Sequence, residues 1–442
     1  MTERALLVGF GVTNQAVADK LLAYGQEVVV VDDAPSAEAT EAAAARGVEL
    51  IVAPDDVRLS ELVHGATMVV PSPGLGDTHA VIDIARHAGV ALGSEFDLAA
   101  AWDDRPLLAV TGTDGKTTVT TLTADMLEAS GVRAVAVGNT DVPLVAAIDD
   151  PAIDVFVVEA SSFRLCHSQH FAPLVGTWLN FGPDHLDRHR TLETYELAKA
   201  RIWRDQSSDA WAVGSADDPV VLRHLWAARA RHVTFGLNDV ADYRVVEGAL
   251  RTPDGDVLAK TDDLWRRFPH DLSNALAAAA TALPGGATLA GCHEALLRFR
   301  GLPHRISLVG ESGGVRWYDD SKATTPGATL AAVRSFDTVV LIAGGRNKGL
   351  DLGVLAIAAP HVRAVVAIGE ATDEVSRAFA GVRPVVTASS MADAVDRAAT
   401  LAEPGDVVLL SPACASFDWY SSYGERGDDF ARYVSHHIGA TP

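Results

Sequence analysis

The stretch Leu107-Leu-Ala-Val-Thr-Gly-Thr-Asp-Gly-Lys-Thr-Thr118 changes from an apolar run into a glycine-rich turn that ends in a lysine and two threonines. This order predicts a strand, a flexible turn and the start of a helix, which direct several backbone N–H groups toward one point. Lys116 can bring a positive charge to a terminal phosphate, and Thr117 can offer its hydroxyl to the Mg²⁺ that accompanies it. We therefore predict a bound nucleoside triphosphate. The alternative is an ordinary strand-to-helix turn with a surface lysine, because the first glycine of the standard G-x-x-x-x-G-K-[ST] loop would fall at Val110.

Length, composition and charge limit the class of protein. A chain of 442 residues is long for one hydrophobic core, so two or three domains are expected. Hydrophobic content of 48% with 21% charged residues is typical of a soluble globular protein. A net charge of −22 makes nucleic acid a poor partner, because phosphate backbones bind to basic surfaces. Neither a membrane span nor a signal peptide is recognisable, which predicts a cytoplasmic protein.

The three cysteines are odd in number and far apart, at Cys166, Cys292 and Cys414. This spacing argues against a disulfide framework or a thiolate zinc site. We expect all three to be small buried hydrophobic residues.

Apolar runs that alternate with helical segments over the whole chain predict an α/β fold with parallel sheets. Polar, proline-containing stretches near residues 102–106 and 301–305 divide the chain into three domains. The predicted domains are residues 1–104, residues 105–300 and residues 301–442. The first and third are expected to be Rossmann-like, and the central one is expected to be a P-loop-type ATPase domain.

The N-terminal segment has the layout of a dinucleotide-binding unit. Residues 5–13 form an apolar run with a Gly-x-Gly turn, and residues 28–33 form a second run that ends in acids. The third glycine of the fingerprint is absent, with Ala16 the nearest small residue. A site for a nucleotide diphosphate and a plain α/β turn both remain open at this point.

Most of the polar clusters follow the predicted carboxyl end of a strand, where open α/β sheets bind ligands. Glu159 ends one such run and could hold Mg²⁺, although an acid here could also cap a helix or pair with Arg164. Three further clusters follow strands of the third domain: residues 318–325, residues 344–349 and residues 411–420. A structural turn is an equal competitor for each cluster taken alone.

Two features of the central domain leave alternatives open. Asp184, His185, Asp187 and His189 crowd four potential metal ligands together, which could build a zinc or manganese hydrolase site or a single histidine ligand for Mg²⁺. Periodicity places Lys199 on a helix over residues 195–202, where a lysine is normally at the surface.

These segments together resemble the Mur ligase family, the ATP-dependent amide ligases of peptidoglycan precursor synthesis. The resemblance covers essentially the whole chain, in the order of the family's motifs. It runs through residues 111–117, 159–163, 180–189, 198–202, 301–305 and 320–324. The final segments, residues 410–416 and 424–427, are most like those of family members that add D-glutamate.

The resemblance implies a role for individual residues. The ATP contacts would be Gly112, Thr113, Asp114, Gly115, Lys116, Thr117, Thr118, Asn274, Arg305, Asp320 and Lys322. Two Mg²⁺ ions would be held by Thr117, Glu159, His185 and Lys199, and Lys199 would carry a carbamate. Lys116, His185 and Lys199 would be catalytic. The UDP-linked substrate would contact Val12, Thr13, Asp33, Ser72 and Asn139. The amino acid would contact Thr324, Lys348, Ser416 and Tyr423.

The implied reaction joins D-glutamate to UDP-N-acetylmuramoyl-L-alanine through an acyl phosphate, in a monomeric enzyme. Within the family, the alternative is a ligase for L-glutamate or for a folate-polyglutamate-type substrate. Outside it, the alternatives are a non-catalytic NTP-binding protein, which would need the Lys116 loop alone, and a nicotinamide-dependent oxidoreductase, which would leave that loop without a role.

Overall fold

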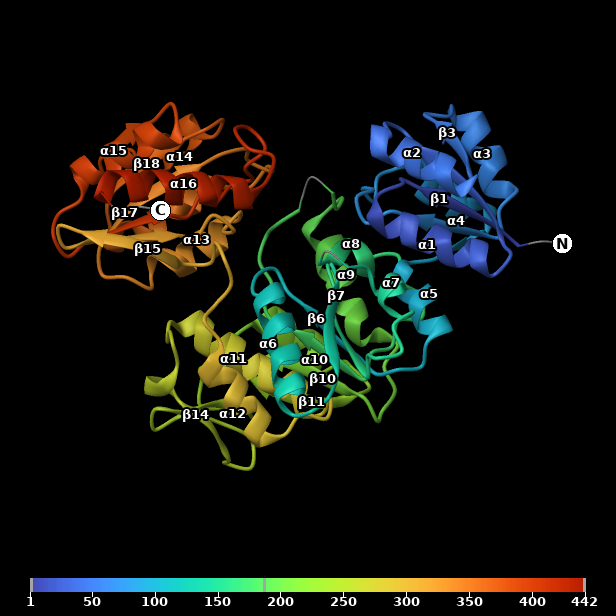
Figure 1. Ribbon diagram of the computed structural model, residues 1–442, viewed down its shortest axis with the longest axis horizontal. Coiled ribbons are helices and arrows are strands. Elements are labelled where there is room, and N and C mark those ends of the chain that lie inside the picture. Colours follow the sequence, from blue (N-terminus) through green and yellow to red (C-terminus); the bar gives the residue numbers. More distant parts are fainter. Residues whose placement is uncertain (1–2, 141, 186–187, 440–442) are drawn as a thin grey trace. The chain divides into compact units, whose positions relative to one another are not determined.

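The computed structural model describes residues 3–140, 142–185 and 188–439, coloured along the chain in Figure 1. It contains three mainly parallel sheets with helices between their strands, which confirms the predicted α/β class. The chain divides into two compact units. The first runs through Met1–Phe181 and Asp187–Phe299, and the second through Gly182–Leu186 and Arg300–Pro442. Within the part that the structure describes, no helix is long and apolar enough to cross a membrane.

The N-terminal sheet of the first unit has five parallel strands in the order β3-β2-β1-β4-β5. Its elements are β1 (Arg4–Val8), α1 (Val12–Ala23), β2 (Glu27–Asp32), α2 (Ala37–Arg46), β3 (Glu49–Val52), α3 (Asp56–His64), β4 (Met68–Pro71), α4 (Ala80–Ala88), β5 (Ala91–Leu92) and α5 (Glu95–Trp102). The chain first adds β2 and β3 on one side of β1 and then adds β4 and β5 on its other side, so the strand order reverses at β1. This is the switch point at which open α/β sheets bind ligands.

The central sheet has six parallel strands in the order β11-β10-β9-β6-β8-β7. Its strands are β6 (Leu107–Thr111), β7 (Ala134–Gly138), β8 (Val155–Glu159), β9 (Val175–Trp178), β10 (Trp211–Ser215) and β11 (Arg231–Phe235). The helices are α6 (Lys116–Ala129), α7 (Leu144–Ala147), α8 (Ser162–Leu165), α9 (Leu192–Arg204), α10 (Pro219–Leu225), α11 (Pro269–Ala282) and α12 (Leu289–Arg298). The strand that carries the glycine-rich loop, β6, is interior to the sheet, so its loop lies between those of β8 and β9.

A small antiparallel sheet follows β11 and was not expected from the sequence. It consists of β12 (Arg244–Val246), β13 (Ala249–Arg251) and β14 (Val257–Lys260), followed by the 3₁₀ turn η1 (Thr261–Asp263). These strands are three or four residues long, so they offer too few residues for a clear alternating pattern.

The sheet of the second unit has the order β15-β16-β20-β17-β18-β19 and is parallel except for the edge strand β15. The strands are β15 (Ser307–Ser312), β16 (Val315–Asp319), β17 (Val339–Gly344), β18 (Val362–Ile368), β19 (Val385–Thr387) and β20 (Val407–Leu410). The helices are α13 (Pro326–Val333), η2 (Leu352–His361), α14 (Thr372–Phe379), α15 (Met391–Leu401) and α16 (Tyr423–Ile438). The antiparallel edge strand, formed by a hairpin at Gly313 and Gly314, is a second departure from the predicted all-parallel arrangement.

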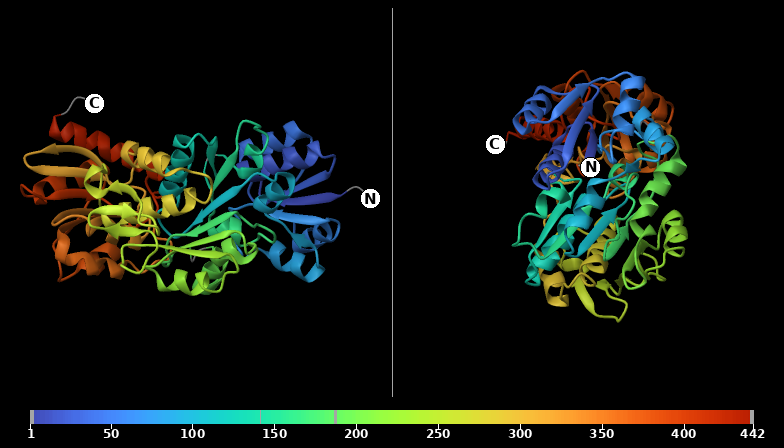
Figure 2. Two further views of the ribbon diagram at one scale, coloured as in Figure 1. Left: turned by 90° about the horizontal axis from the view of Figure 1, so that it is seen from below. Right: turned by 90° about the vertical axis from the view of Figure 1, so that its right-hand side faces the viewer.

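Hydrophobic packing explains why the first two sheets belong to one unit. One continuous cluster of buried residues includes Phe10 and Phe96 of the N-terminal part and Phe156, Phe171 and Trp178 of the central part. The rings of Phe96 and Phe171 stack with centroids 4.8 Å apart. In the second unit, α15 and α16 pack on one face of the sheet. Figure 2 shows the ribbon from two further sides.

Candidate active site

The glycine-rich loop joins β6 to α6, as the sequence predicted. Gly115 is the N-cap of α6 and has φ 86°, a conformation that L-residues rarely adopt. A Cβ at this position would lie 2.7 Å from Asn274 Oδ1 of α11. The N-cap residue makes no side-chain hydrogen bond to the start of α6. The first N–H groups of a helix have no acceptor within the helix itself and point toward the preceding turn. The loop therefore has the backbone of an anion site.

Asn180, which follows β9, holds the loop in shape. Its Oδ1 accepts hydrogen bonds from the backbone N–H groups of Thr113 at 3.0 Å and Asp114 at 2.9 Å. Its Nδ2 donates to Asp114 O at 3.1 Å. The sequence had placed Asn180 in a motif without a role. The structure makes it the clamp of the glycine-rich loop.

Two lysine ammonium groups converge on one carbonyl of this loop. Lys116 Nζ donates to Gly112 O at 2.9 Å and to Thr113 O at 2.8 Å. Lys199 Nζ, from α9, donates to Gly112 O at 2.6 Å and lies 4.5 Å from the centre of the Tyr195 ring. The two side chains therefore place positive charge at the turn where the triphosphate is expected.

The surface position that helix periodicity predicted for Lys199 is wrong. The residue is 1% exposed, on the buried stripe of α9 that also holds Tyr195, Ala198 and Ile202. A lysine can occupy this stripe because its head group finds the Gly112 carbonyl and the face of an aromatic ring.

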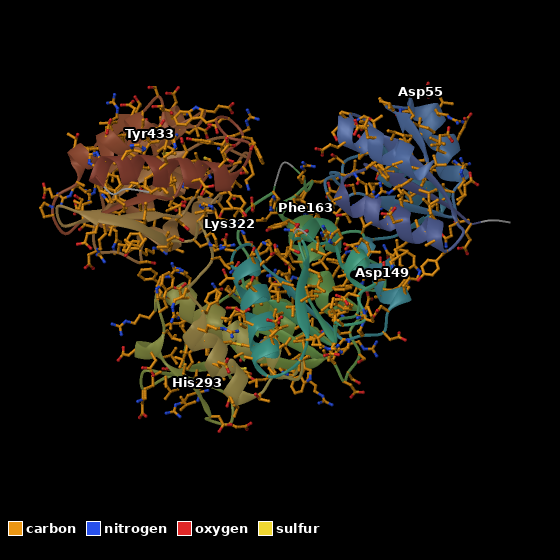
Figure 3. The ribbon with its side chains drawn as sticks, in the orientation of Figure 1. Asp55, Asp149, Phe163, His293, Lys322 and Tyr433 are labelled. Atoms are coloured by element: carbon orange, nitrogen blue, oxygen red, sulfur yellow. The ribbon has the colours of Figure 1, made fainter. Side chains whose placement is uncertain are left out.

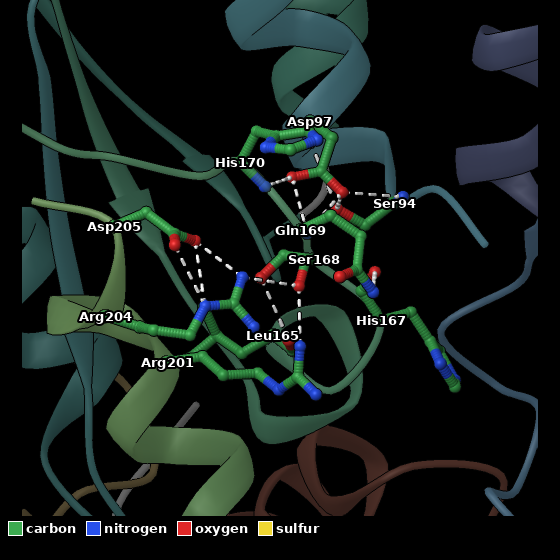
Figure 4. A network of polar contacts seen from close by, with 10 residues as sticks. All are labelled: Ser94, Asp97, Leu165, His167, Ser168, Gln169, His170, Arg201, Arg204 and Asp205. Atoms are coloured by element: carbon green, nitrogen blue, oxygen red, sulfur yellow. Dashed lines mark hydrogen bonds and ion pairs between the residues drawn. The ribbon is translucent and has the colours of Figure 1, made fainter. Parts of the chain in front are cut away.

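The helix that carries Lys199 is itself anchored by a polar network (Figure 4). Arg201 and Arg204 of α9 both donate to Ser168 O, at 2.7 and 3.0 Å. The next residues in that loop, Gln169 and His170, donate their backbone N–H groups to the Asp97 carboxylate of α5. The position of Lys199 is thus tied through α9 to the N-terminal part of the unit.

Glu159 ends β8 and is suited to hold a cation. The side chain is 3% exposed, and its Oε1 accepts a hydrogen bond from Asn139 Nδ2 at 3.0 Å. Its Oε2 is buried and has no hydrogen-bond partner among the residues that the structure describes. A buried carboxylate oxygen that lacks a partner is costly, and a bound Mg²⁺ would satisfy it. Asn139, which we expect to contact the UDP-linked substrate, thus also orients the Glu159 carboxylate.

The four potential metal ligands of residues 184–189 have different surroundings. Asp184 is buried and pairs with Lys348 Nζ at 2.7 Å and with His185 Nε2 at 3.1 Å. The nearby positive groups hold the pKa of Asp184 below its usual value, against the effect of burial. His189 is bonded to Ser162 Oγ at 2.9 Å and stacks on Phe163. Asp187 lies outside the described residues. Within the described ranges, no three histidine, cysteine or acidic side chains gather as a metal cluster.

The N-terminal glycine turn is closed by one side chain from α1 and one from the end of β2. Asn14 Nδ2 donates to Gly9 O at 2.8 Å and to Val70 O at 3.2 Å. Asp32 Oδ2 accepts from Phe10 N at 2.9 Å. A Cβ on Gly9, which has φ 80°, would lie 2.8 Å from Ser72 Cβ, so the turn passes close to β4. Asn14 and Asp32 were not singled out from the sequence.

Four of the residues expected at the UDP-linked substrate follow strands of the N-terminal sheet, namely Val12, Thr13, Asp33 and Ser72, whereas Asn139 follows β7 of the central sheet. Val12 is exposed at the start of α1, and Asp33 pairs with His79 Nε2 at 3.0 Å. Thr13 is buried, and its Oγ1 accepts a hydrogen bond from Arg164 Nη2 at 3.0 Å. Arg164 also pairs with the buried Glu95 carboxylate. Arg164 thus joins the helix after β8 to the start of α1 through Thr13 and to α5 through Glu95.

In the second unit, the predicted nucleotide residues follow β16. Asp320 is buried, its Oδ2 accepts from Ser411 Oγ at 2.7 Å, and burial raises its pKa to about 7. Lys322 Nζ lies 5.1 Å from the centre of the Tyr423 ring, and its position is labelled in Figure 3. Thr324 N donates to Lys322 O at 2.9 Å, within the same tight turn.

The residues expected to bind the amino acid come from three loops of this unit. Lys348 follows β17, Ser416 is buried after β20, and Tyr423 begins α16. Arg426, buried in α16, ties these loops together by donating to Ser321 O at 2.8 Å and to Cys414 O at 3.1 Å.

The cysteine prediction needs one correction. Cys292 and Cys414 are buried, whereas Cys166 is partly exposed. Cys166 is the C-cap of the short helix α8, and the end of so short a helix is incompletely covered.

Comparison with known proteins identifies the family. Residues 110–282 match the Mur ligase middle domain, and residues 304–414 match the Mur ligase, glutamate ligase domain. A UDP-N-acetylmuramoylalanine–D-glutamate ligase of Frankia casuarinae is 43% identical, over 97% of this chain and 93% of that protein. The chain belongs to the Mur ligase family. A ligase of the same name from Desulfosudis oleivorans is 38% identical, over 98% of this chain and 96% of that protein.

Solved Mur ligase structures share the fold. The UDP-N-acetylmuramate–alanine ligase of Thermotoga maritima has a TM-score of 0.59 at 20% identity, over 99% of this chain and 100% of the other. A pseudomurein peptide ligase of Methanothermus fervidus has a TM-score of 0.62 at 17% identity, with the same coverage. The three-domain α/β fold is therefore that of the family, and Mur ligases use ATP and Mg²⁺.

Proposed function

We propose that this protein joins D-glutamate to UDP-N-acetylmuramoyl-L-alanine at the expense of ATP, in the synthesis of peptidoglycan precursors. The observation that carries the proposal is the nearly full-length similarity, at 36–43% identity, to ligases that bear this name. We further propose that the enzyme is a monomer. We place it in the cytoplasm, where ATP and UDP-linked precursors are made and used.

The residues of the glycine-rich loop fit an ATP–Mg²⁺ complex. Thr117 and Glu159 would hold one Mg²⁺, and the unpartnered Glu159 Oε2 is the atom that supports this assignment. His185 and a carboxylated Lys199 would hold a second. When bound, Mg²⁺ neutralises phosphate charge and polarises the P–O bonds. The remaining ATP contacts are proposed as the resemblance implies them, with Asn274 at the adenine, Arg305 at the phosphates and Asp320 at the ribose.

Carboxylation of Lys199 is supported by the chemistry of its surroundings. The ammonium group is removed from water and is set beside a second lysine at Gly112 O. A carbamate would replace one of two neighbouring positive charges by an anionic oxygen ligand. Carbon-13 NMR of the enzyme equilibrated with labelled bicarbonate would detect it. Absence of a carbamate signal, together with full activity of Lys199→Ala, would refute it.

In the proposed reaction, the alanyl carboxylate attacks the γ-phosphorus of ATP, and ADP leaves. The amine of D-glutamate then attacks the acyl phosphate carbon, an amide bond forms, and inorganic phosphate departs. Lys116 offsets the charge of the transferred phosphoryl group, and Lys348, Thr324, Ser416 and Tyr423 bind the two glutamate carboxylates. Most of the rate enhancement then comes from positioning and charge neutralisation.

The experiment measures phosphate release with ATP, UDP-N-acetylmuramoyl-L-alanine and a panel of amino acids of both chiralities. We expect release that depends on D-glutamate. Turnover with L-glutamate alone, or with a folate substrate, would overturn the proposed specificity. Phosphate release without any amino acid would indicate a nucleotide-binding protein of another kind. The Lys116→Met variant distinguishes this activity from that of a contaminating phosphatase, which the substitution would not change. Sedimentation equilibrium measures the molar mass in solution and so tests whether the enzyme is a monomer.

A further inference from the structure

The segment Gly301–Ile306, which leads into β15, has an unusual backbone. His304 has φ 59° and Ile306 has φ 49°, with Arg305 between them. Positive φ is uncommon for residues other than glycine, and for a β-branched residue it is a genuine outlier. Such conformations persist where the surroundings over-determine them, and they cluster at functional sites.

Contacts with the end of β16 hold His304 in this conformation. Its Nδ1 is 2.6 Å from Asp319 Oδ2, and the Asp319 carboxylate is buried. The other oxygen, Asp319 Oδ1, accepts a hydrogen bond from Ser321 N at 2.8 Å. In addition, Lys322 N donates to His304 O at 3.1 Å. The imidazole and the backbone of His304 are thus both tied to residues 319–322.

Helix α16 is shaped to accommodate this pair. A Cβ at Gly427 would lie 2.2 Å from His304 Nδ1 and 2.6 Å from Asp319 Oδ2. Gly427 has ordinary helical φ, so its lack of a side chain serves this close approach and not the backbone. The helix loses some propensity by carrying a glycine in its interior. The His304–Asp319 contact is therefore packed from a third element.

The two residues that flank this contact in sequence are Arg305 and Asp320. Arg305 lies between the two strained residues, and Asp320 follows Asp319 directly. Asp320 is held on its other side by Ser411 Oγ and by its own N–H bond to Leu410 O at 2.8 Å. The hydrogen bond between His304 and Asp319 thus sets the spacing of Arg305 and Asp320, the two residues that are proposed to bind the nucleotide.

We propose that His304 is a positioning residue for the nucleotide, which acts through Asp319 to fix Arg305 at the phosphates and Asp320 at the ribose of ATP. The inference rests on the proposed function, because the nucleotide roles of Arg305 and Asp320 belong to it. His304 itself touches no reacting group in this role.

The charges around His304 make the role dependent on pH. The hydrogen bond from His304 to Asp319 raises the pKa of the imidazole above its usual 6.5, and the charge of Asp428 on α16 acts in the same direction. Partial burial and the ammonium of Lys322 oppose the shift, and the Tyr423 ring packs edge-on against the imidazole. The charged pair is therefore complete below pH 6.5 and is lost as pH rises through the raised pKa.

The test compares His304→Ala with His304→Asn in steady-state kinetics and in calorimetric titration with Mg²⁺–ATP. Asparagine keeps a donor at the reach of Nδ1 and tolerates positive φ, but it cannot be charged. We expect His304→Ala to raise the KM and Kd for ATP about tenfold or more, with a smaller change in kcat. His304→Asn should restore most of the affinity and remove its pH dependence. Asp319→Asn should move the rise in KM to lower pH.

His436→Ala, an exposed histidine on the same helix as Gly427, is the matched control and should leave both constants unchanged. Wild-type KM for ATP in His304→Ala would overturn the inference, as would an unchanged pH profile in Asp319→Asn. An equal rise in the KM of every substrate would overturn it too, because it would indicate a general structural defect. A wild-type enzyme that neither binds nor hydrolyses ATP would overturn the proposed function itself, and the inference with it.

Discussion

Two glycine turns in the first unit are built alike and completed differently. In both, a buried strand runs through a turn into a helix, from β1 to α1 and from β6 to α6. Both helices begin at a glycine N-cap, Gly11 and Gly115, without a side-chain cap and without an acid in the first turn. By contrast, α2 and α9 are capped by Ser36 and Thr191. The N–H groups of the first helical turn and the helix dipole favour an anion at both turns.

The difference lies in the positive charge at each turn. Lys116 and Lys199 both reach the Gly112 carbonyl of the second turn. The first turn is closed by Asn14 and Asp32, and its nearest described guanidinium, Arg164, is already paired with Glu95. A substrate diphosphate that is only held needs N–H donors, whereas a transferred phosphoryl group also needs charge that is preorganised for the transition state. We infer that the first turn binds and that the second one reacts.

The largest expected effect comes from breaking the buried ion pair between Arg164 of α8 and Glu95 of α5. Among the described residues, Arg164→Met would leave the buried Glu95 carboxylate with Val145 N, at 3.3 Å, as its remaining hydrogen-bond donor. We expect the free energy of unfolding to fall by about 3–5 kcal/mol, since removing one partner of a buried ion pair leaves an uncompensated charge. Urea unfolding measures it. The double variant Arg164→Met/Glu95→Gln should recover much of the loss, and a stable single variant would show that the pair does not hold the parts together.

The second-largest effect is expected from removal of the positive charge of Lys116 at the second turn. Lys116→Met keeps the length of the side chain but removes the positive charge, and we expect kcat to fall about 10²–10³-fold, as for the loss of one preorganised electrostatic group. Binding of the UDP-linked substrate in the absence of ATP should not change. The control is Lys260→Met, an exposed lysine of β14. Equal losses in the two variants would remove the distinction between the turns.

The sequence predicted the two glycine turns better than it predicted the side chains that hydrogen-bond to them. Apolar runs followed by glycine, lysine and threonine indicated β6 and α6 because those signals are local. Asn180 binds the loop from 66 residues away in sequence, and Glu95 meets Arg164 across 69 residues. No local pattern reports such contacts. The expectation that Lys199 is exposed failed for the same reason, since its carbonyl partner lies 87 residues away.

For Lys199, helix periodicity predicted a surface position, whereas the family resemblance implied a role in the metal site. It was less informative at Asn139 and His304. The first contacts Glu159, and the second is defined by backbone strain and by the space at Gly427. The assignments of individual site residues stay predictions until they are tested by substitution.

The two asparagine clamps offer a paired test of smaller size. Asn180→Ala would remove the Oδ1 acceptor of Asp114 N and one of two acceptors of Thr113 N, which keeps the residue-180 carbonyl at 3.1 Å. Asn14→Ala would remove the Nδ2 donor to Gly9 O. Each change should cost about 1–3 kcal/mol of stability, the cost of leaving buried polar groups unsatisfied. We expect Asn180→Ala to raise the KM for ATP and Asn14→Ala to raise the KM for the UDP-linked substrate. The turns would not have separate roles if each variant raised the KM of the other substrate, or if both variants raised the KM of the same substrate.

The smallest effect distinguishes the two N-cap glycines. Gly115→Ala should cost at least about 1 kcal/mol and weaken ATP binding, because φ 86° is strained for alanine and the Cβ would meet Asn274 Oδ1 at 2.7 Å. Gly11 has φ −74° and nothing within 4 Å of an added Cβ. Gly11→Ala should therefore change stability by less than about 0.5 kcal/mol. Thermal unfolding measures both. If Gly11→Ala nevertheless raises the KM for the UDP-linked substrate at unchanged stability, the glycine serves the close approach of a ligand and not the fold, and the first turn is a binding site in its own right.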